Sequence, residues 1–279
     1  MNSGEWLREA EAALRKARVP FPGRDALLLL SSALGRDKSA VLAHPEEVLA
    51  PEASQTAGGF LARRCRREPL QYIRGFHEFW GIPVHVGPGC LIPRPETEHL
   101  VEQALSAVEG VVEPHVAEVG VGSGCVLLAL WLERPDAFLA GVERDLQALA
   151  WARRNLAAVP GVALVRADLE GVAVLRELDA LVSNPPYITD EEWDDLPPEV
   201  RDFEPAEALR CGSDAMAPYR HLARWAADAL RPGGFLLCEL GIAQAKRPSA
   251  LRALHPALAW QRGVRDLAGH MRVAVWQRV

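Results

Sequence analysis

The sequence predicts an α/β protein in which a mostly parallel sheet follows a small helical domain. After Pro114, short apolar runs alternate with helical stretches, which is typical of parallel strands joined by crossover helices. Before residue 70, apolar residues recur with the spacing of amphipathic helices, and no convincing strand is found. The length of 279 residues accommodates one small and one larger domain.

Composition argues against several classes of protein. The formal net charge of −6 argues against a protein that binds nucleic acid over a broad basic surface, so no stable nucleic-acid partner is expected. The five cysteines lack the spacing of a zinc site, and we expect no bound metal. Their odd number and the lack of a signal peptide predict a cytoplasmic location. No apolar run is long enough to cross a bilayer, so no membrane partner is expected.

Residues 1–70 are expected to form the helical domain. Trp6, Ala10 and Leu14 share one helix face, and Gly35 is suited to end a second helix over 25–34. A third helix is expected to start at Ser39, and a longer fourth to cover 52–67. The basic run 63–67 could form a nucleic-acid patch. A solvated helix face next to Glu68 is the favoured interpretation.

Residues 71–93 are expected to connect the two domains as a β-hairpin. Ile82, Val84 and Val86 alternate with other residues as in a half-buried strand, and Trp80-Gly81 precedes them. The run from Pro93 to Glu98 then leads into a helix. Acidic residues such as Glu96 and Glu98 are favourable at a helix N-terminus, so a capping role is an alternative to a role in the site.

Residues 94–279 are expected to hold the sheet. Helices are expected over 146–158 and 219–230, and Pro232-Gly-Gly234 marks a turn before a strand. The expected strands are 115–119, 138–142, 163–166, 180–183, 235–240 and 272–277.

A glycine-rich loop follows the first of these strands. Gly120, Gly122 and Gly124 give the spacing G-x-G-x-G, which lets the backbone turn tightly and approach a ligand. The dinucleotide fingerprint G-x-G-x-x-G requires a glycine where Cys125 stands, and no Lys-Ser/Thr pair completes a phosphate loop. The ligand therefore need not carry phosphate, and S-adenosylmethionine fits.

Three acidic residues stand at the ends of three successive predicted strands. Glu118 could face the methionine part of such a ligand, Glu143 the ribose hydroxyls, and Asp168 the adenine amino group. Each acid alone is more simply read as a solvated turn residue. The set of three beside a glycine loop favours a ligand site, because open α/β sheets bind ligands at the carboxyl ends of their strands.

The segment Asn184-Pro-Pro-Tyr187 follows the fourth of these strands. An amide nitrogen is a poor nucleophile, and a site that accepts both of its N–H groups can hold it in line with a methyl donor. The side-chain oxygen of Asn184 and the carbonyl of Pro185 offer two acceptors, and Tyr187 offers a flat face for stacking. The alternative is a rigid Pro-Pro turn with a buried tyrosine. The preceding glycine loop favours a catalytic segment.

Several segments together resemble the HemK/PrmC family. Asn184-Pro-Pro-Tyr187 after a G-x-G-x-G loop is similar to class I amino-methyltransferases in general. Five further segments resemble this family in particular: 69–75 (PLQYIRG), 77–81 (HEFWG), 91–98 (LIPRPETE), 202–209 (DFEPAEAL) and 238–241 (CELG). The resemblance covers nearly the whole chain. It implies a Rossmann-like domain with a seven-stranded sheet, S-adenosylmethionine as cofactor, and class I peptide chain release factors as partners.

The resemblance also implies roles for individual residues. It implies methylation at N5 of the glutamine in the Gly-Gly-Gln motif of the release factor, with the helical domain gripping that protein. The chain departs from the usual family pattern where Glu118 and Glu143 replace aspartate, and in the loop Gly212–Met216. The expected cofactor contacts are Glu118, Gly120, Val121, Gly122, Ser123, Gly124, Glu143, Arg144, Asp168, Leu169 and Asn184. The expected catalytic and substrate-binding residues are Asn184, Pro185, Pro186 and Tyr187, with Arg94 and Glu96 also at the substrate.

Two rival functions remain open at this point. One is the same chemistry on a ribosomal-protein glutamine or on N6 of a nucleic-acid adenine, although base methylation in a duplex requires flipping the base. The other is a catalytically silent scaffold that binds S-adenosylmethionine, which has no need for Asn184–Tyr187.

Overall fold

The computed structural model describes residues 1–168 and 175–279, which form two compact units. The first unit contains Met1–Phe76 together with Pro197–Phe203, and the second contains His77–Leu196 together with Glu204–Val279. Leu169, expected from the sequence to contact the cofactor, lies outside the described residues.

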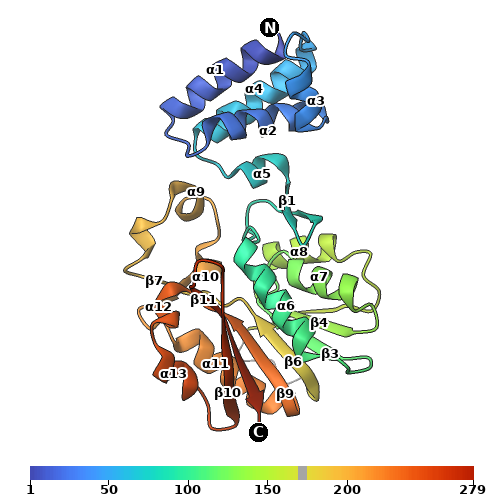
Figure 1. The fold of residues 1–279 in the computed structure, drawn as a ribbon, viewed down its shortest axis with the longest axis vertical. Coiled ribbons are helices and arrows are strands. Elements are labelled where there is room, and N and C mark those ends of the chain that lie inside the picture. Colours follow the sequence, from blue (N-terminus) through green and yellow to red (C-terminus); the bar gives the residue numbers. More distant parts are fainter. Residues whose placement is uncertain (169–174) are drawn as a thin grey trace. The chain divides into compact units, whose positions relative to one another are not determined.

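The first unit is helical, as predicted (Figure 1). Its first helix begins with a capping box in which Asn2 and Glu5 satisfy each other's backbone N–H groups. Gly35 ends the second helix in the left-handed conformation, with φ of 61°. The core is apolar and includes Trp6, Leu14 and Leu30. The helices are α1 (Ser3–Lys16), α2 (Pro22–Leu34), α3 (Lys38–Ala43), α4 (Pro51–Cys65), α5 (Leu70–Arg74) and α9 (Pro198–Arg201).

A buried ion cluster ties the first unit together. The guanidinium of Arg64 donates to Asp25 over 2.8 Å and to Glu199 over 3.0 Å, and Arg67 forms a two-bonded pair with Glu199. The side chain of Arg64 is only 6% exposed. The prediction of a solvated helix face is therefore wrong for Arg64, because this side of α4 packs against α2. Arg63 is half-buried and pairs with Glu68.

The predicted hairpin forms from β1 (Phe76–Phe79) and β2 (Ile82–His85). Its turn residues Trp80 and Gly81 both have positive φ, 53° and 71°, as in the type I′ turns that suit twisted hairpins. Trp80 is held there by two acids: its backbone N–H donates to Glu98 and its indole N–H to Glu133. Trp80 thus anchors the hairpin.

A seven-stranded sheet forms the centre of the second unit and confirms the predicted fold class. The strand order is β10-β11-β9-β6-β3-β4-β5, with β11 antiparallel to both of its neighbours and the pairs from β9 to β5 parallel. The strands are β3 (His115–Val119), β4 (Phe138–Glu143), β5 (Ala163–Arg166), β6 (Leu178–Ser183), β9 (Leu230–Glu239), β10 (Leu258–Arg265) and β11 (Met271–Arg278).

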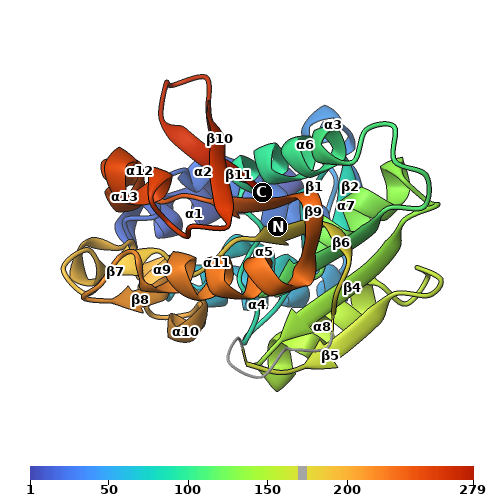
Figure 2. The same ribbon diagram turned by 90° about the horizontal axis from the view of Figure 1, so that it is seen from below.

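Helices cover both faces of this sheet. Figure 2 shows α6 and α11 on opposite sides of the strands around β9. Tyr219, Leu222 and Trp276 fill the core beneath α11 without exposed surface. Within the described residues, no helix is both long and apolar enough to cross a membrane. The α-helices are α6 (Glu98–Ala107), α7 (Cys125–Glu133), α8 (Leu146–Asn155), α10 (Ala206–Leu209), α11 (Ala217–Ala229), α12 (Ile242–Ala245) and α13 (Pro248–Arg252), and the 3₁₀ turns are η1 (Pro95–Thr97) and η2 (Trp193–Asp195).

Three strands were not expected from the sequence. Strand β10 lies at the edge of the sheet, and its register shifts between Trp260 and Arg262, which breaks the alternation that marks a strand. Strands β7 (Ile188–Thr189) and β8 (Arg210–Gly212) form a separate two-stranded parallel pair and are too short for any periodic signal.

Candidate active site

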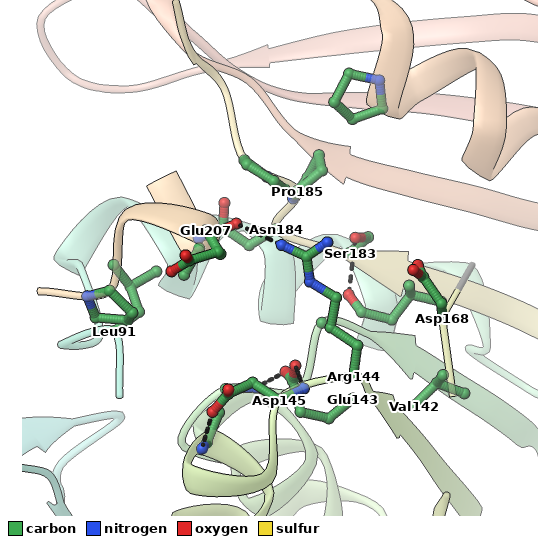
Figure 3. A pocket seen from close by; sticks show the side chains of 18 of the residues that line it. Leu91, Val142, Glu143, Arg144, Asp145, Asp168, Ser183, Asn184, Pro185 and Glu207 are labelled. Atoms are coloured by element: carbon green, nitrogen blue, oxygen red, sulfur yellow. Dashed lines mark hydrogen bonds between the residues drawn. The ribbon is translucent and has the colours of Figure 1, made fainter. Parts of the chain in front are cut away.

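A cavity of about 580 Å³ lies in the second unit, at the carboxyl ends of its parallel strands. The register aligns these ends, because Val119 of β3 stands beside both Val142 of β4 and Ser183 of β6. Side chains that follow different strands therefore converge on one space (Figure 3). Its volume lies within the usual range for a small-molecule site.

The glycine loop forms one wall of this cavity through Gly120 and Gly122. Both have positive φ, 74° and 55°, a conformation that side chains disfavour. Gly124 begins α7 at φ of 80°, and a Cβ there would lie 3.0 Å from Leu156. Gly124, Val121 and Ser123 do not line the cavity. They support the loop from behind, with the Ser123 carbonyl accepting from the side chain of Asn155.

Glu143 shapes the loop from the end of β4. One carboxylate oxygen accepts from the backbone N–H of Gly122 over 3.0 Å, and the other accepts from that of Asp145 over 2.9 Å. The residue is 8% exposed and lines the cavity. Each oxygen keeps a further lone pair for a ligand hydroxyl.

The other predicted cofactor residues divide into two groups. Arg144 and Asp168 line the cavity, and Figure 3 shows Arg144 reaching the backbone carbonyl of Glu207, 3.5 Å away. Glu118 does not line it and is 2% exposed. Burial raises the pKa of Glu118 well above its usual range, and the charge of Glu143 raises it further. Among the described residues, the Oε2 atom of Glu118 has no hydrogen-bond partner.

The predicted catalytic segment follows β6. Asn184, Pro185 and Pro186 line the cavity, whereas Tyr187 does not. The side-chain N–H of Asn184 donates to the hydroxyl of Thr97 over 3.3 Å. Within the described part of the chain, neither the side-chain oxygen of Asn184 nor the carbonyl of Pro185 accepts a hydrogen bond. Two acceptors are thus available beside the cavity.

Tyr187 is fixed from two sides. Its backbone carbonyl accepts from the fully buried side chain of Gln244 over 3.0 Å. Its ring packs against Gly241 so closely that a Cβ there would lie 2.7 Å from Cδ2 of Tyr187. A side chain at position 241 would therefore displace the ring.

Arg94 and Glu96, expected at the substrate, do not line the cavity. Arg94 pairs with Glu204 over 2.6 Å, and the buried Glu204 also accepts from the backbone N–H of Ile92. Glu96 lies 3.5 Å from Arg272. In the structure both residues thus hold the segment before α6 against the rest of the second unit.

Several cavity residues were missed from the sequence. The loop Gly212–Met216 gains a role, since Asp214 caps the Met216 N–H and Gln244 holds the Ala215 carbonyl. These contacts position the start of α11, which lines the cavity.

Among the missed cavity residues, Gly89 had the clearest sequence signal, because it belongs to a pair of glycines around Pro88. A Cβ at Gly89 would lie 2.2 Å from Gln147. The missed lining residues include Gly89, Leu91, Asp145, Gln147, Ala148, Pro205, Ala208, Arg210, Cys211, Ala217, Pro218 and His221.

A parallel sheet with this glycine loop, these acids and an Asn-Pro-Pro-Tyr segment defines an S-adenosylmethionine-dependent methyltransferase of class I. Comparisons with known proteins agree, since residues 97–196 match the methyltransferase small domain family and residues 5–75 match the PrmC N-terminal domain family. The chain belongs to the family of release factor glutamine methyltransferases.

Relatives of that name are similar over most of their length. The protein of Geobacter sulfurreducens is 41% identical over 87% of this chain and 84% of its own. That of Caulobacter vibrioides is 38% identical over 95% and 93%, and that of Escherichia coli K12 is 37% identical over 86% of each. Among solved structures, the hMettl16 catalytic domain matches with a TM-score of 0.55 at 15% identity, covering 81% of each chain, and supports the fold.

The residues around the cavity fit the cofactor S-adenosylmethionine. This molecule is a cation, and the carboxyl groups of Glu143 and Asp168 line the cavity. Glu118 precedes the lining residue Val119, and its Oε2 has no partner among the described residues. The glycine loop leaves room for a ligand against its backbone, and Val119, Val142 and Ala167 provide apolar wall for an adenine ring.

Proposed function

We propose that this enzyme methylates N5 of the glutamine in the Gly-Gly-Gln motif of class I peptide chain release factors. The observation that carries the proposal is a pair of acceptors at the cavity wall, the Asn184 side-chain oxygen and the Pro185 carbonyl, which accept no hydrogen bond from any described residue. A primary amide has two N–H donors, so this pair matches it. The names of the relatives support a release factor as the protein partner.

The segment Asn184–Tyr187 acts by orienting the target amide. With both N–H groups held, the nitrogen presents its face to the methyl donor, and rotation of the amide is suppressed. S-adenosylmethionine supplies an electrophilic methyl group when it is bound. The proton can leave the nitrogen afterwards, so this site requires no strong base. Pro186 keeps the segment extended. We assign stacking on the bound amide to the ring of Tyr187, which lies behind the cavity lining on Gly241.

The remaining roles extend the proposal to the other predicted residues. We assign the cofactor to the glycine loop, with Glu143 on the ribose hydroxyls and Asp168 on the adenine amino group. Recognition of the release factor is assigned to the helical domain, residues 1–70, with 71–93 as connector and 94–279 as the catalytic domain. The cytoplasm is the proposed location, consistent with five free thiols. No stable nucleic-acid complex forms part of the proposal.

Replacing Glu143 by alanine is expected to weaken S-adenosylmethionine binding by about 10- to 100-fold, the worth of charge-assisted hydrogen bonds. The variant loses the ribose acceptors and frees the N–H of Gly122. Titration calorimetry with the cofactor measures this directly. Glu102→Ala, which removes an exposed carboxylate of α6, should bind as the wild type does. Equal affinity of both variants would contradict the role of Glu143.

A methyl-transfer assay with labelled S-adenosylmethionine tests the proposed function. Purified release factor, ribosomal protein and DNA are offered side by side, and the modified site is mapped by mass spectrometry. Label on the Gly-Gly-Gln glutamine is the expected result. Label confined to ribosomal protein or DNA would overturn the substrate assignment and leave the cofactor, whereas no label on any of them would favour the scaffold.

A further inference from the structure

A buried carboxylate, Glu239, reaches both ends of the segment Asn184–Tyr187. Its Oε2 accepts a 2.6 Å hydrogen bond from the hydroxyl of Thr97, and that hydroxyl accepts from the side-chain amide of Asn184. The side chain of Tyr187 interacts with the same carboxylate and helps to lower its pKa. Thr97 and Glu239 are 3% and 2% exposed, and neither lines the cavity.

The direction of this hydrogen-bond chain follows from proton counting. A threonine hydroxyl has one proton, and an ionised carboxylate can only accept, so Thr97 must donate to Glu239. Thr97 can then offer only an acceptor to Asn184. The amide of Asn184 must turn its NH₂ group to Thr97, which leaves its oxygen as the group available to the cavity.

We propose that Thr97 and Glu239 are positioning residues of methyl transfer, which set the side-chain amide of Asn184 with its oxygen toward the substrate. The kinetic consequence of this inference rests on the proposed function. The orientation of the Asn184 amide does not depend on it. Without this hydrogen-bond chain, the Asn184 amide could present its NH₂ group to the target, and that group would repel the N–H donors of a glutamine.

The rest of the fold holds Glu239 in place. It is the last residue of β9, and its backbone carbonyl accepts from the buried hydroxyl of Tyr219 on α11 over 2.9 Å. Thr97 is the last residue of η1, whose neighbours Arg94 and Glu96 are themselves ion-paired. The hydrogen-bond chain of Asn184, Thr97 and Glu239 thus joins three segments that are far apart in the sequence.

The hydrogen bonds from Asn184 through Thr97 to Glu239 form a relay, and protonation of Glu239 should weaken it. Burial raises the pKa of Glu239 to about 7, with Glu96 raising it and hydrogen bonds from Thr97 and Tyr187 and the charge of Arg272 lowering it. A neutral carboxyl can donate to Thr97, and Thr97 can then donate to Asn184 and reverse the amide. Other groups facing Glu239 are the buried Tyr219 and Cys125, whose raised pKa values keep them neutral near pH 7.

Two consequences of opposite sign follow from that pKa. Methyl transfer should fall as the pH falls through about 7, because the ionised form orients Asn184. Folding stability should change the other way. A carboxyl whose pKa is raised on folding binds its proton more tightly in the folded chain, so its ionisation destabilises the fold as the pH rises toward 7. Glu239→Gln should therefore melt higher than the wild type at alkaline pH.

Selective NMR labelling tests the orientation without any substrate. The protein has only three asparagines, Asn2, Asn155 and Asn184, so ¹⁵N-asparagine labels three side-chain amides. The signal that is lost in Asn184→Ala is that of Asn184. The Asn184 signal should move with an apparent midpoint near pH 7 in the wild type. It should not do so in Glu239→Gln or Thr97→Val. A signal that moves equally in all three proteins would overturn the relay.

Kinetics on the release factor test the consequence. Thr97→Val, nearly the same in shape, should lower kcat about 10- to 100-fold with cofactor affinity within about threefold of wild type. Thr97→Ser, which keeps the hydroxyl, should restore kcat, and Glu239→Gln should show a flat pH profile from about pH 6 to about 8.5. Loss in Thr97→Ser as large as in Thr97→Val, or an unchanged acid limb in Glu239→Gln, would overturn the proposal. If the wild type fails to label the release factor, the proposed function fails, and the NMR titration still decides the relay.

Discussion

Replacing Asn184 by alanine should lower kcat for methylation of the release factor by about 10²- to 10³-fold, the usual cost of losing a preorganised polar group that orients or stabilises the reacting atoms. The variant removes one of two acceptors for the target amide, so its nitrogen can rotate away from the methyl donor. Residues of the glycine loop and Glu143 remain, so cofactor affinity should stay within about threefold of wild type. Single-turnover kinetics with saturating cofactor separate these effects.

The same chemical deletion elsewhere gives the control. Asn2→Ala removes an asparagine amide at the N-cap of α1 and leaves the cavity untouched, so kcat should be unchanged. An Asn184→Ala enzyme with near-normal kcat would contradict the role of this side chain. A variant that lost cofactor binding in proportion to activity would place Asn184 at the cofactor instead of the amide.

Replacing Arg64 by methionine should destabilise the helical unit by about 3–5 kcal/mol, because it leaves the buried carboxylate of Asp25 with only a 3.4 Å contact to the exposed Arg24. Asp25 is 2% exposed, and Arg64 supplies one of its ion pairs from within the core. The methionine keeps most of the apolar stem, so lost packing contributes little. Hydrogen exchange of peptides from residues 1–76 measures the local opening free energy.

The neighbouring Arg63 provides the matched comparison. It is also ion-paired, to Glu68, but its side chain is 35% exposed, so Arg63→Met should cost below about 1 kcal/mol. Adding Asp25→Leu to Arg64→Met should recover much of the loss, since the unpaired charge is then gone. Protection in Arg64→Met as close to wild type as in Arg63→Met would show that Arg64 contributes little to stability.

Much of the fold could be predicted because its signals are local. The strands β3, β4, β5 and β6 are short apolar runs bounded by turn residues, and the hairpin carries its own turn in Trp80-Gly81. Strand β10 could not be predicted in this way. Its pairing with β11 shifts register twice, so the sequence has no steady period, and only the neighbouring strand keeps it extended.

The residues of the candidate site likewise include some that local sequence signals predict and some that they do not. Gly120, Gly122, Glu143 and Asn184 could be predicted because each lies at the end of a strand, and open sheets collect ligands there. The burial of Arg64 could not, because a run of arginines in one sequence looks solvated until its acidic partners are placed. Thr97 and Glu239 meet over 142 positions of sequence, and no spacing rule connects them.

The distribution of the ion cluster along the chain has a consequence for synthesis on the ribosome. Asp25, Arg64 and Arg67 emerge early, but Glu199 follows more than a hundred residues later. At translation rates of about 5–20 residues per second, both arginines wait on the order of ten seconds for Glu199, which is the second acidic partner of Arg64 and the partner of Arg67. The nascent helical unit therefore passes through an interval in which Arg64 has Asp25 as its partner and the half-buried Arg67 still lacks Glu199. Its full stability is reached only when most of the catalytic sheet has already been made.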